Sequence, residues 1–404
     1  MIDPRNIVLT DVTAVLPDRL LPGATIVIRD GVIVEVADGV RSGVGVVDGH
    51  GVLCMPGIVD THSDALEKEL RPRPGVILPT EFALHSFEGR ALAAGVTTMF
   101  HGVGFEENGK YDRSVAQAVE LCAVIDRRAA GGRAILDHHV LHRLDVRDAD
   151  GLAALVSRLD SWVPADRVEP LPLVSYEDHT PGQGQYTDRS WFERYIAGTR
   201  SITMDEAARV VDEVIAERDS MLGVRERAIE ELGRRAVAGE IRLMAHDPTD
   251  ADEIVAARGA GMTIAEFPTT VAAARAAREV GMRTVSGGPN ALRGTSHSGN
   301  VSARELIAAG LCDGLASDYL PSTLIGSMAA MVDAGVCDLP TGVALVTSGP
   351  ADTVGLVDRG RLAVGQRADL VLLDLVGAMP TVRFVVSQAT TAAVRDAALT
   401  GAAR

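Results

Sequence analysis

The chain has 404 residues and a formal net charge of −16 at pH 7, from 39 basic and 55 acidic side chains. Hydrophobic residues make up 47% of it, which is enough for a sizeable core and excludes a disordered chain. The acidic balance argues against a nucleic-acid-binding protein, because such a protein needs a basic face.

Neither a membrane segment nor an export signal is expected. No apolar run approaches the roughly 20 residues that span a membrane. The opening MIDPRNIVLT lacks the basic-then-apolar order of a signal peptide. Four scattered cysteines form no CxxC pair and predict no disulfide framework. We therefore expect a cytoplasmic protein in a reducing compartment.

Residues 7–53 alternate short Val- and Ile-rich runs with Gly and Asp-Gly turns, which predicts a small antiparallel sheet. The same texture returns near the end of the chain, in GRLAVGQRADLVLLD and PTVRFVVS. We expect residues 1–54 and 355–404 to form one small β-sandwich domain, and residues 55–354 to form a separate domain between them.

The middle of the chain alternates short apolar strands with helices rich in Ala, Arg and Glu. The eight candidate strands are PGIVDTH, GVTTMFHGV, AILDHHVL, EPLPLVSYED, IRLMAHD, MTIAEFP, RTVSGG and DGLASD. Eight strands separated by helices predict an α/β protein with a (β/α)8 TIM barrel. A longer excursion over residues 180–240, between the fourth and fifth strands, is expected to contain one extended helix.

Polar side chains gather at the ends of these strands, which is where the active site of such a barrel forms. The residues concerned are His62, Asp64, His101, His138, His139, His142, Glu177, Asp178, His179, His246, Glu266 and Asp318. This clustering of His, Asp and Glu favours a metal-binding face.

The first metal motif is the sequence HSD, in which His62 and Asp64 are two residues apart. In an extended backbone such residues point to one side, so both can bind one ion. Imidazole with carboxylate suits Zn²⁺, or else Mn²⁺ or iron, better than Ca²⁺. Together with His179, His246 and Asp318 at other strand ends, the motif predicts a centre of one or two ions.

Other residues have both a metal-binding and a structural interpretation. His138 and His139 face opposite ways on a strand, so at most one of them points inward. His139, His142 and His101 are candidates for additional ligands or for lining the site. A buried carboxylate at Glu266 needs a partner or a metal ion, and orienting a ligand histidine is its alternative role.

A polar loop after the seventh strand, residues 286–305, is the main candidate for binding an anion. Its glycines and a helix that starts near Ser302 offer backbone N–H groups, although an ordinary polar loop with an N-cap is the alternative. The substrate-binding candidates in it are Asn290, Arg293, Ser296, His297, Ser298 and Asn300. The segment LEKELRPRPG adds Lys68, Arg71 and Arg73, which otherwise form a solvated charge run.

Longer motifs resemble a known family. MPGIVDTHSD and GRLAVGQRADLVLLD resemble the first-strand metal motif and the closing β segment of the amidohydrolase superfamily. DTHSDALEKELRPRPGV, LVSYEDHTPGQGQY, IAEFPTT, GGPNALRGTSHSGNVSARELIAAG and LASDYLPSTL are similar to the α-D-ribose 1-methylphosphonate 5-triphosphate diphosphatase family of phosphonate metabolism. The resemblance covers most of the chain. It implies metal-dependent hydrolysis that releases diphosphate and leaves a 5-phosphate.

Lysine is scarce, and this constrains the metal centre. Many amidohydrolases bridge two metal ions with a carboxylated lysine on the fourth strand. The two lysines of this chain, Lys68 and Lys110, follow the first and second strands instead. Any bridge must come from the carboxylate of Glu177, Asp178 or Asp64, or from water; otherwise the centre has one ion.

The resulting prediction is a metal-dependent phosphohydrolase with Asp318 and His246 as its catalytic residues. An ion lowers the pKa of a bound water toward neutrality, and Asp318 either binds the ion or accepts that proton as general base. Aromatic residues are only 3% of the chain. Stacking on a nucleobase is therefore less expected than binding of an anionic small molecule such as a sugar phosphate.

Two alternatives stay open. The same centre could hydrolyse a C–N bond in an amide or cyclic amide, or deaminate its substrate. A non-catalytic binding protein on the same fold would lack metal ligands, whereas His62, Asp64, His179, His246 and Asp318 are all present. Apolar helices leave self-association into a homo-oligomer open.

Overall fold

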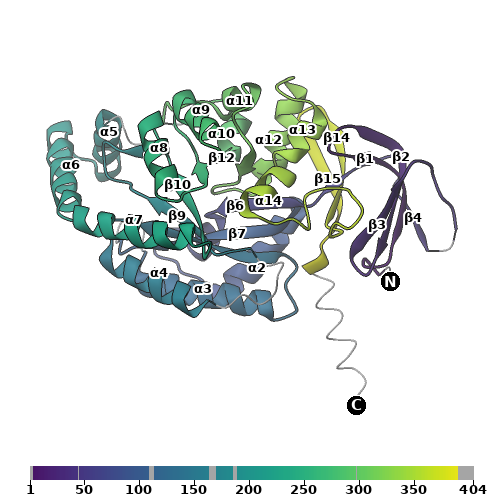
Figure 1. Cartoon of the computed structure of the whole chain (residues 1–404), viewed down its shortest axis with the longest axis horizontal. Coiled ribbons are helices and arrows are strands. Elements are labelled where there is room, and N and C mark those ends of the chain that lie inside the picture. Colours follow the sequence, from purple (N-terminus) through teal and green to yellow (C-terminus); the bar gives the residue numbers. More distant parts are fainter. Residues whose placement is uncertain are drawn as a thin grey trace, which may run out of the picture.

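Eight parallel strands follow one another around a barrel, each hydrogen-bonded to the next in chain order (Figure 1). They are β6 (Ile58–Ser63), β7 (Val96–Phe105), β8 (Asp137–Asp145), β9 (Leu173–Glu177), β10 (Arg242–His246), β11 (Ile264–Glu266), β12 (Arg283–Gly287) and β13 (Gly314–Ala316). An isolated parallel bridge between Ser63 and Asp318 connects β6 to the segment after β13. The predicted (β/α)8 barrel is confirmed. This computed structural model describes residues 3–43, 45–108, 113–162, 170–184, 189–296 and 298–389.

Two strands differ from the sequence prediction in their extent. β7 continues to Phe105, and β8 runs from Asp137 to Asp145 in parallel register with it. The histidines that were expected at the ends of these strands therefore lie inside them; they are His101, His138, His139 and His142.

Helices connect the strands and cover the outside of the barrel (Figure 1). They are α1 (Ala65–Leu70), α2 (Thr80–Ala93), α3 (Val115–Ala130), α4 (Ala149–Ser161), α5 (Arg189–Arg200), α6 (Met204–Asp219), α7 (Leu222–Val237), α8 (Ala251–Gly259), α9 (Val271–Glu279), α10 (Gly288–Arg293), α11 (Ala303–Ala308), α12 (Ser322–Asp333), α13 (Leu339–Ala344) and α14 (Ser348–Val354). Side chains cap several of their starts: Ser114, Asp148 and Asp250 each accept a hydrogen bond from the backbone N–H three residues on. Within the described residues, no helix has both the length and the apolar character needed to cross a membrane.

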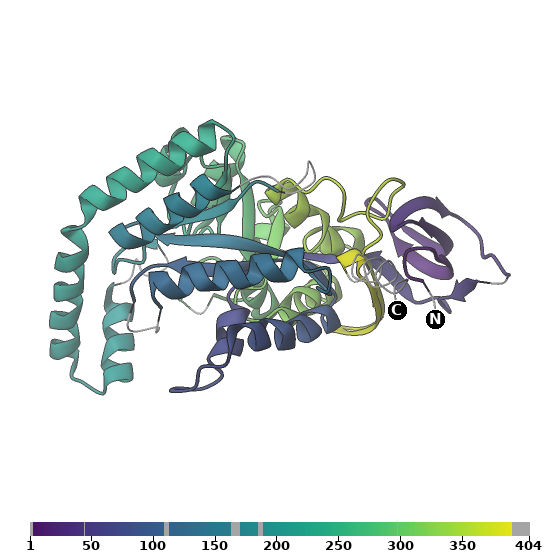
Figure 2. The ribbon, with the colours of Figure 1, turned by 90° about the horizontal axis from the view of Figure 1, so that it is seen from below.

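The excursion between β9 and β10 folds as three helices, so the prediction of one extended helix is wrong. The break falls between α6 and α7, because the two helices bury their apolar faces against different partners. α6 packs Val211 against Ile196 of α5 in a small separate cluster, whereas α7 packs Leu232 into the main core. Figure 2 shows the three helices, in teal, at one end of the molecule and the small sheet at the other.

One apolar layer fills the inside of the barrel, and each strand contributes one residue to it. The layer consists of Val59, Phe100, Leu141, Leu173, Met244, Ile264, Val285 and Ala316. Ala351 and Val354 of α14, with Leu356 just after it, pack against this layer at the base. Side chains alternate along a strand, so residues two positions further along point into the barrel above the apolar layer.

The first and last strands of the chain form a seven-stranded sheet in the order β15–β14–β5–β1–β2–β3, with β4 paired to β1. They are β1 (Val8–Val15), β2 (Leu20–Arg29), β3 (Val32–Ala37), β4 (Val46–Asp48), β5 (Leu53–Pro56), β14 (Leu370–Val376) and β15 (Met379–Val386). β1 pairs with β4 and then with β5, so the sheet divides there and folds over its own apolar core.

This sheet confirms the β-sandwich built from both ends of the chain. The boundaries predicted for the two domains, 1–54 with 355–404 and 55–354, stay a prediction. Residues 390–404, at the end of the predicted small domain, lie outside the described residues.

Candidate metal centre and active site

The layer directly above the apolar one carries the polar residues of the site. Two positions on from the apolar residues of β7 to β13 lie Gly102, Arg143, Ser175, His246, Glu266, Gly287 and Asp318. β6 adds His62 through a register shift between Asp60 and Ser63. Alternation along the strands therefore brings these residues of distant chain segments to one level of the barrel.

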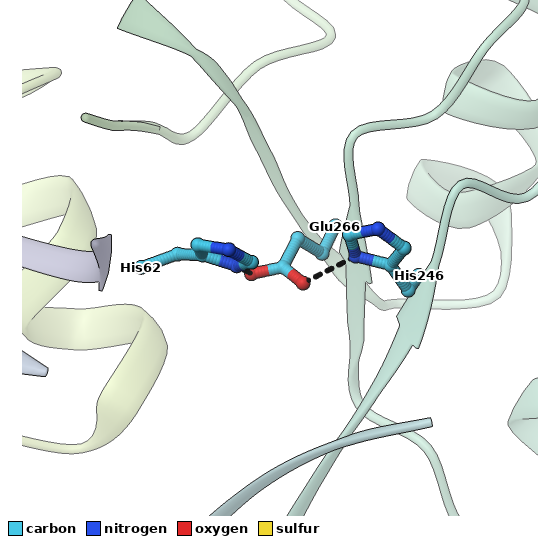
Figure 3. A group of neighbouring side chains, drawn as sticks. All are labelled: His62, His246 and Glu266. Atoms are coloured by element: carbon cyan, nitrogen blue, oxygen red, sulfur yellow. Dashed lines mark hydrogen bonds and ion pairs between the residues drawn. The ribbon is translucent and has the colours of Figure 1, made fainter. Parts of the chain in front are cut away.

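Glu266 stands between the rings of His62 and His246 (Figure 3). Its two oxygens each accept a hydrogen bond of 2.8 Å, one from His62 Nδ1 and one from His246 Nδ1. Ser175 Oγ donates a third at 3.0 Å. Burial would raise the pKa of Glu266, but the two rings hold it at about 2. The carboxylate thus fixes both rings through Nδ1 and leaves both Nε2 atoms for another ligand.

Closure of the barrel brings His62, Asp64 and Asp318 together. Asp64 N–H donates to Asp318 O at 2.5 Å, and Asp318 N–H donates to His62 O at 3.0 Å. Single ligand atoms of the three side chains lie within 4.8 Å of one another. Asp318 has a left-handed backbone with φ 58°, an uncommon conformation that concentrates at functional sites. Burial, and then the charge of Asp64, raise the pKa of Asp318 to about 6.

A second group of possible ligands is formed by Glu177, His179 and His246, whose ligand atoms also lie within 4.8 Å of one another. Glu177 lies 3.9 Å from each of the two rings. Asp247 Oδ2 lies 3.2 Å from His246 Nε2. Burial lowers the pKa of His179. His246 therefore stands between the Glu266 carboxylate and this second group.

The residues present fit a divalent metal ion. Asp64 Oδ1 and Asp247 Oδ2 are buried and accept no hydrogen bond from any described residue, which is costly unless a ligand satisfies them. Asp64 Oδ1 lies 3.4 Å from His62 Nε2. Burial would lower the pKa of His62, but Glu266 and Asp64 raise it to about 10, so binding an ion there displaces a proton.

Arg143 lies among these carboxylates and is only 7% exposed. Its Nη1 donates to Asp64 Oδ2 at 2.5 Å, Nε to Glu177 Oε1 at 2.8 Å and Nη2 to Glu177 Oε2 at 3.0 Å. Against the effect of burial, its guanidinium holds the pKa values of Asp64 and Glu177 well below their usual range. Arg143 thus ties a residue of the first group to a residue of the second.

The site opens into a pocket of about 550 Å³. The floor carries His62, His246 and Asp318. Apolar side chains of α5 and α6 form part of its wall; they are Phe192, Ile196, Val210 and Val214. The helices between β9 and β10 are therefore part of the binding site.

Five arginines line the same pocket: Arg113, Arg143, Arg200, Arg218 and Arg293. Arg113 forms ion pairs with Glu67 and Glu106, and Arg218 with Asp145 and Asp178. Across the described chain, Arg200 and Arg293 form neither an ion pair nor a side-chain hydrogen bond. These two guanidiniums are available to an anionic ligand.

Part of the predicted anion-binding loop reaches the pocket. Asn290, Arg293 and Ser296 line it. Asn290 also has a structural role, because its amide donates to Val301 O at 3.1 Å and its Oδ1 accepts from Ala303 N–H at 3.0 Å. Ser296 Oγ lies 3.1 Å from Ser298 Oγ, so of these three residues Arg293 is the one whose side chain makes no bond within the loop among the described residues.

The rest of the predicted substrate-binding set is placed elsewhere. Ser298 and Asn300 bond to each other at 3.0 Å and are not part of the pocket wall. His297 lies outside the described residues.

The basic segment after β6 also lies away from the pocket. Lys68 and Arg73 are exposed and do not line it. Arg71 donates to Gln117 Oε1 at 2.8 Å and lines a separate cavity of about 460 Å³. The helix α1 turns this segment away from the mouth of the barrel, so the structure does not bring the three cations to the metal groups.

Four further candidates also lie outside the pocket. His101 and His142 have the opposite parity to the inward residues of their strands, so they face the helices. His142 bonds to Leu173 O and to Arg158 Nε of α4. His139 points inward but below the apolar layer, where it stacks on Phe100. Asp178 forms ion pairs with Arg147, which does not line the pocket, and with Arg218, which does. It belongs to neither group of possible metal ligands.

Sequence reasoning missed several residues of the pocket, above all Arg143 and Asp247. The alternation that places Leu141 inside the barrel also places Arg143 inside, so that signal was available. Asp247 follows the strand end His246 directly and has an unusual φ of 52°, which the sequence does not reveal. Arg200 and Arg218 belong to α5 and α6, between β9 and β10. No sequence motif in this segment indicated that its helices would reach the pocket.

Comparison with known proteins gives two consistent findings. Residues 53–398 match the sequence profile of the Amidohydrolase family. The chain is 34% identical, over 316 residues, to the α-D-ribose 1-methylphosphonate 5-triphosphate diphosphatase of Escherichia coli strain K12. That alignment covers 77% of this chain and 80% of the relative.

Solved structures share the architecture at low sequence identity. A triazine hydrolase variant superposes with a TM-score of 0.63 at 15% identity, covering 96% of this chain and 94% of the other. The dihydropyrimidinase from Brevibacillus agri superposes with a TM-score of 0.56 at 14% identity, covering 91% and 86%. At such identities these likenesses show the fold alone.

Proposed function

The chain belongs to the amidohydrolase family, and from this premise we propose that it cleaves a phosphoanhydride bond. Membership makes it a metal-dependent hydrolase of a small molecule. Our proposed reaction is that of the relative at 34% identity: release of diphosphate from α-D-ribose 1-methylphosphonate 5-triphosphate, within phosphonate metabolism.

The observation that carries this proposal is the set of arginines around the metal groups. Five guanidiniums line one pocket, and Arg200 and Arg293 have no charged partner in the described chain. A substrate with several phosphate groups satisfies such donors bidentately, whereas a neutral amide does not. The net charge of −16 is no obstacle, because five arginines line the pocket where the anion would bind and set the local charge there.

The proposed centre holds one or two divalent ions, and its candidate ligands are the residues that converge on the floor of the pocket. His62, Asp64 and Asp318 form the first group, and His179 and His246 with Glu177 the second. The mixed nitrogen and oxygen donors suit Zn²⁺, with Mn²⁺ or Fe²⁺ compatible. When bound, such an ion supplies Lewis-acid polarisation of an oxygen and acidifies water.

The chain's own residues then have distinct roles. Glu266 holds His62 and His246 through their Nδ1 atoms and keeps both rings in one tautomer. Asp318 lies beside His62 and Asp64 at the pocket floor, and burial raises the pKa of its carboxyl, which suits it to accept and return a proton. Arg293 binds a phosphate of the substrate, and Asn290 shapes the loop that carries it.

Hydrolysis of a C–N bond is the second candidate. It is favoured by the apolar part of the wall, where Phe192, Ile196, Val210 and Val214 would contact an uncharged group. A panel of nucleoside and sugar triphosphates against N-acyl amino acids and cyclic amides separates the two. We expect diphosphate release from a triphosphate; turnover of cyclic amides alone would replace our proposal by this one.

A substitution tests the role of Asp318. We expect Asp318→Asn to lower kcat at least about 10³-fold, because the general base is lost, while the amide oxygen of the new side chain keeps a neutral donor at the site and most of the metal remains bound under excess metal. Turnover and metal content of the purified variant are measured side by side. Wild-type turnover in this variant would refute the assignment of Asp318.

A further inference from the structure

The Arg143 side chain occupies both oxygens of Glu177. Nε donates to one oxygen and Nη2 to the other, at 2.8 and 3.0 Å. This two-point contact between a guanidinium and a carboxylate is strong and fixed in geometry. A carboxylate that bridges two metal ions must offer one oxygen to each of them. Glu177, which ends the fourth barrel strand, could become such a bridge only with the positive charge of Arg143 held against both metal ions, or by releasing Arg143.

The surrounding structure makes room for this arrangement. A Cβ atom at Gly102, in the neighbouring strand β7, would lie 2.3 Å from Asp64 Oδ1 and 3.0 Å from Arg143 Cδ. Any residue larger than glycine would therefore displace one of the two side chains. Arg143 is only 7% exposed, and it lines the pocket. Its charge is permanent, because a guanidinium is not deprotonated in proteins.

Asp64 divides its two oxygens between different tasks. Oδ2 accepts from Arg143 Nη1 at 2.5 Å, whereas the buried Oδ1 accepts no hydrogen bond from any described residue and faces His62 Nε2. One oxygen is thus satisfied by the guanidinium and the other is left for a cation. Lysine is absent from the fourth strand, so a carboxylated lysine cannot restore the bridge.

We propose that the guanidinium of Arg143 takes the place of a second metal ion, so that the centre holds one divalent ion at His62, Asp64 and Asp318. This inference rests on the proposed metal-dependent function. Arg143 acts here as a positioning residue: it holds Asp64 and Glu177 in place and neutralises them whether or not the ion is bound. The group formed by Glu177, His179 and His246 then serves the substrate side of the pocket.

Metal stoichiometry tests the proposal without using activity. The full chain is stripped with a chelator, reloaded with excess Mn²⁺ and desalted, and bound manganese per chain is measured by mass spectrometry. We expect one equivalent in the wild type and in Arg143→Lys, which keeps the charge. We expect Arg143→Met to bind two equivalents, because Glu177 is released. Arg218→Met is the matched control and stays at one, since Arg218 lines the same pocket but bonds to neither Asp64 nor Glu177.

Two results would overturn the proposal: two equivalents in the wild type, or a single equivalent in a folded Arg143→Met variant. If that variant does not fold, the electron paramagnetic resonance spectrum of the manganese-loaded wild type decides. Isolated Mn²⁺ supports one ion, and a spin-coupled pair contradicts it. The stoichiometry is independent of the substrate: one ion without phosphoanhydride hydrolysis refutes the proposed function alone, and two ions with hydrolysis refute this inference alone.

Discussion

Two buried clusters of the barrel are built from the same residue types, yet only one of them opens onto a pocket. At the mouth, Glu266 binds His62 and His246, each through Nδ1. On the outside, Glu88 of α2 accepts from His138 Nε2 at 2.6 Å, and His138 Nδ1 bonds to His101 Nε2 at 2.8 Å.

The difference lies in which ring nitrogens are left over. Glu266 takes one nitrogen from each ring, and the other two nitrogens face carboxylates on the floor of the pocket. In the outer cluster both nitrogens of His138 are used, and Arg128 neutralises Glu88. A histidine–glutamate cluster is therefore no sign of a metal site unless ligand atoms remain free and converge.

The largest expected effect is a loss of stability when the outer cluster is disrupted. Glu88→Gln removes a fully buried carboxylate that pairs with Arg128 and His138, and we expect a loss of about 3 kcal/mol in the free energy of unfolding. Urea unfolding of the metal-free variant and wild type measures it. Metal affinity should be unchanged, and a variant that fails to bind metal would contradict the separation of the two clusters.

The stability that Glu88 contributes to the wild type depends on pH. Burial opposes ionisation of Glu88, but His138 and Arg128 lower its pKa from 4.5 to about 2. A carboxylate with a depressed pKa contributes stability that is present above pH 4.5 and is lost as the pH falls toward 2. The stability difference between wild type and Glu88→Gln should therefore shrink over this range, and a constant difference would speak against the ion pair.

A smaller effect, on metal binding instead of folding, is expected at the mouth. Glu266→Gln loses the negative charge that orients the ligand ring of His62 and the neighbouring ring of His246, and we expect metal affinity to fall by about 10- to 100-fold. Competition with a fluorescent chelator measures the affinity, and Glu88→Gln is the matched control in the other cluster. Unchanged affinity in Glu266→Gln would remove the proposed role of the carboxylate.

The smallest effect is expected for His101→Asn. This change removes one buried hydrogen bond to His138, which is worth about 1 kcal/mol. Thermal unfolding should show a modest decrease in the midpoint temperature Tm. Metal affinity and kcat/KM should stay within about two-fold of the wild type. A large loss of metal affinity would mean that the outer cluster affects the metal-binding residues, and it would contradict the independence of the two clusters.

Strand ends were predictable where the strands are short. Glu177, His246 and Glu266 end β9, β10 and β11, as the apolar runs before them indicated. The prediction failed in β7 and β8, which continue through polar residues. His101 and His142 were expected near the site for that reason, although their parity turns them toward the helices.

Nearness in sequence was a poor guide to the pocket. Lys68 and Arg73 follow the first metal motif within nine residues, yet α1 carries them away from it. Arg200 and Arg218 are remote from every motif, yet the helices after β9 bring them to the pocket wall. Packing of one helix against its neighbours decides this, and no local pattern encodes it.

The sequence by itself determined the barrel, the sandwich made of both ends of the chain, and the residue types of a metal centre, because strand alternation and turn residues are local properties. Only the tertiary structure decided which of those residues meet. Asp64 and Asp318 are 254 positions apart and become neighbours because the barrel closes between its first and last strands. The role of Arg143 likewise depends on register between strands, since register sets the level at which each inward side chain lies.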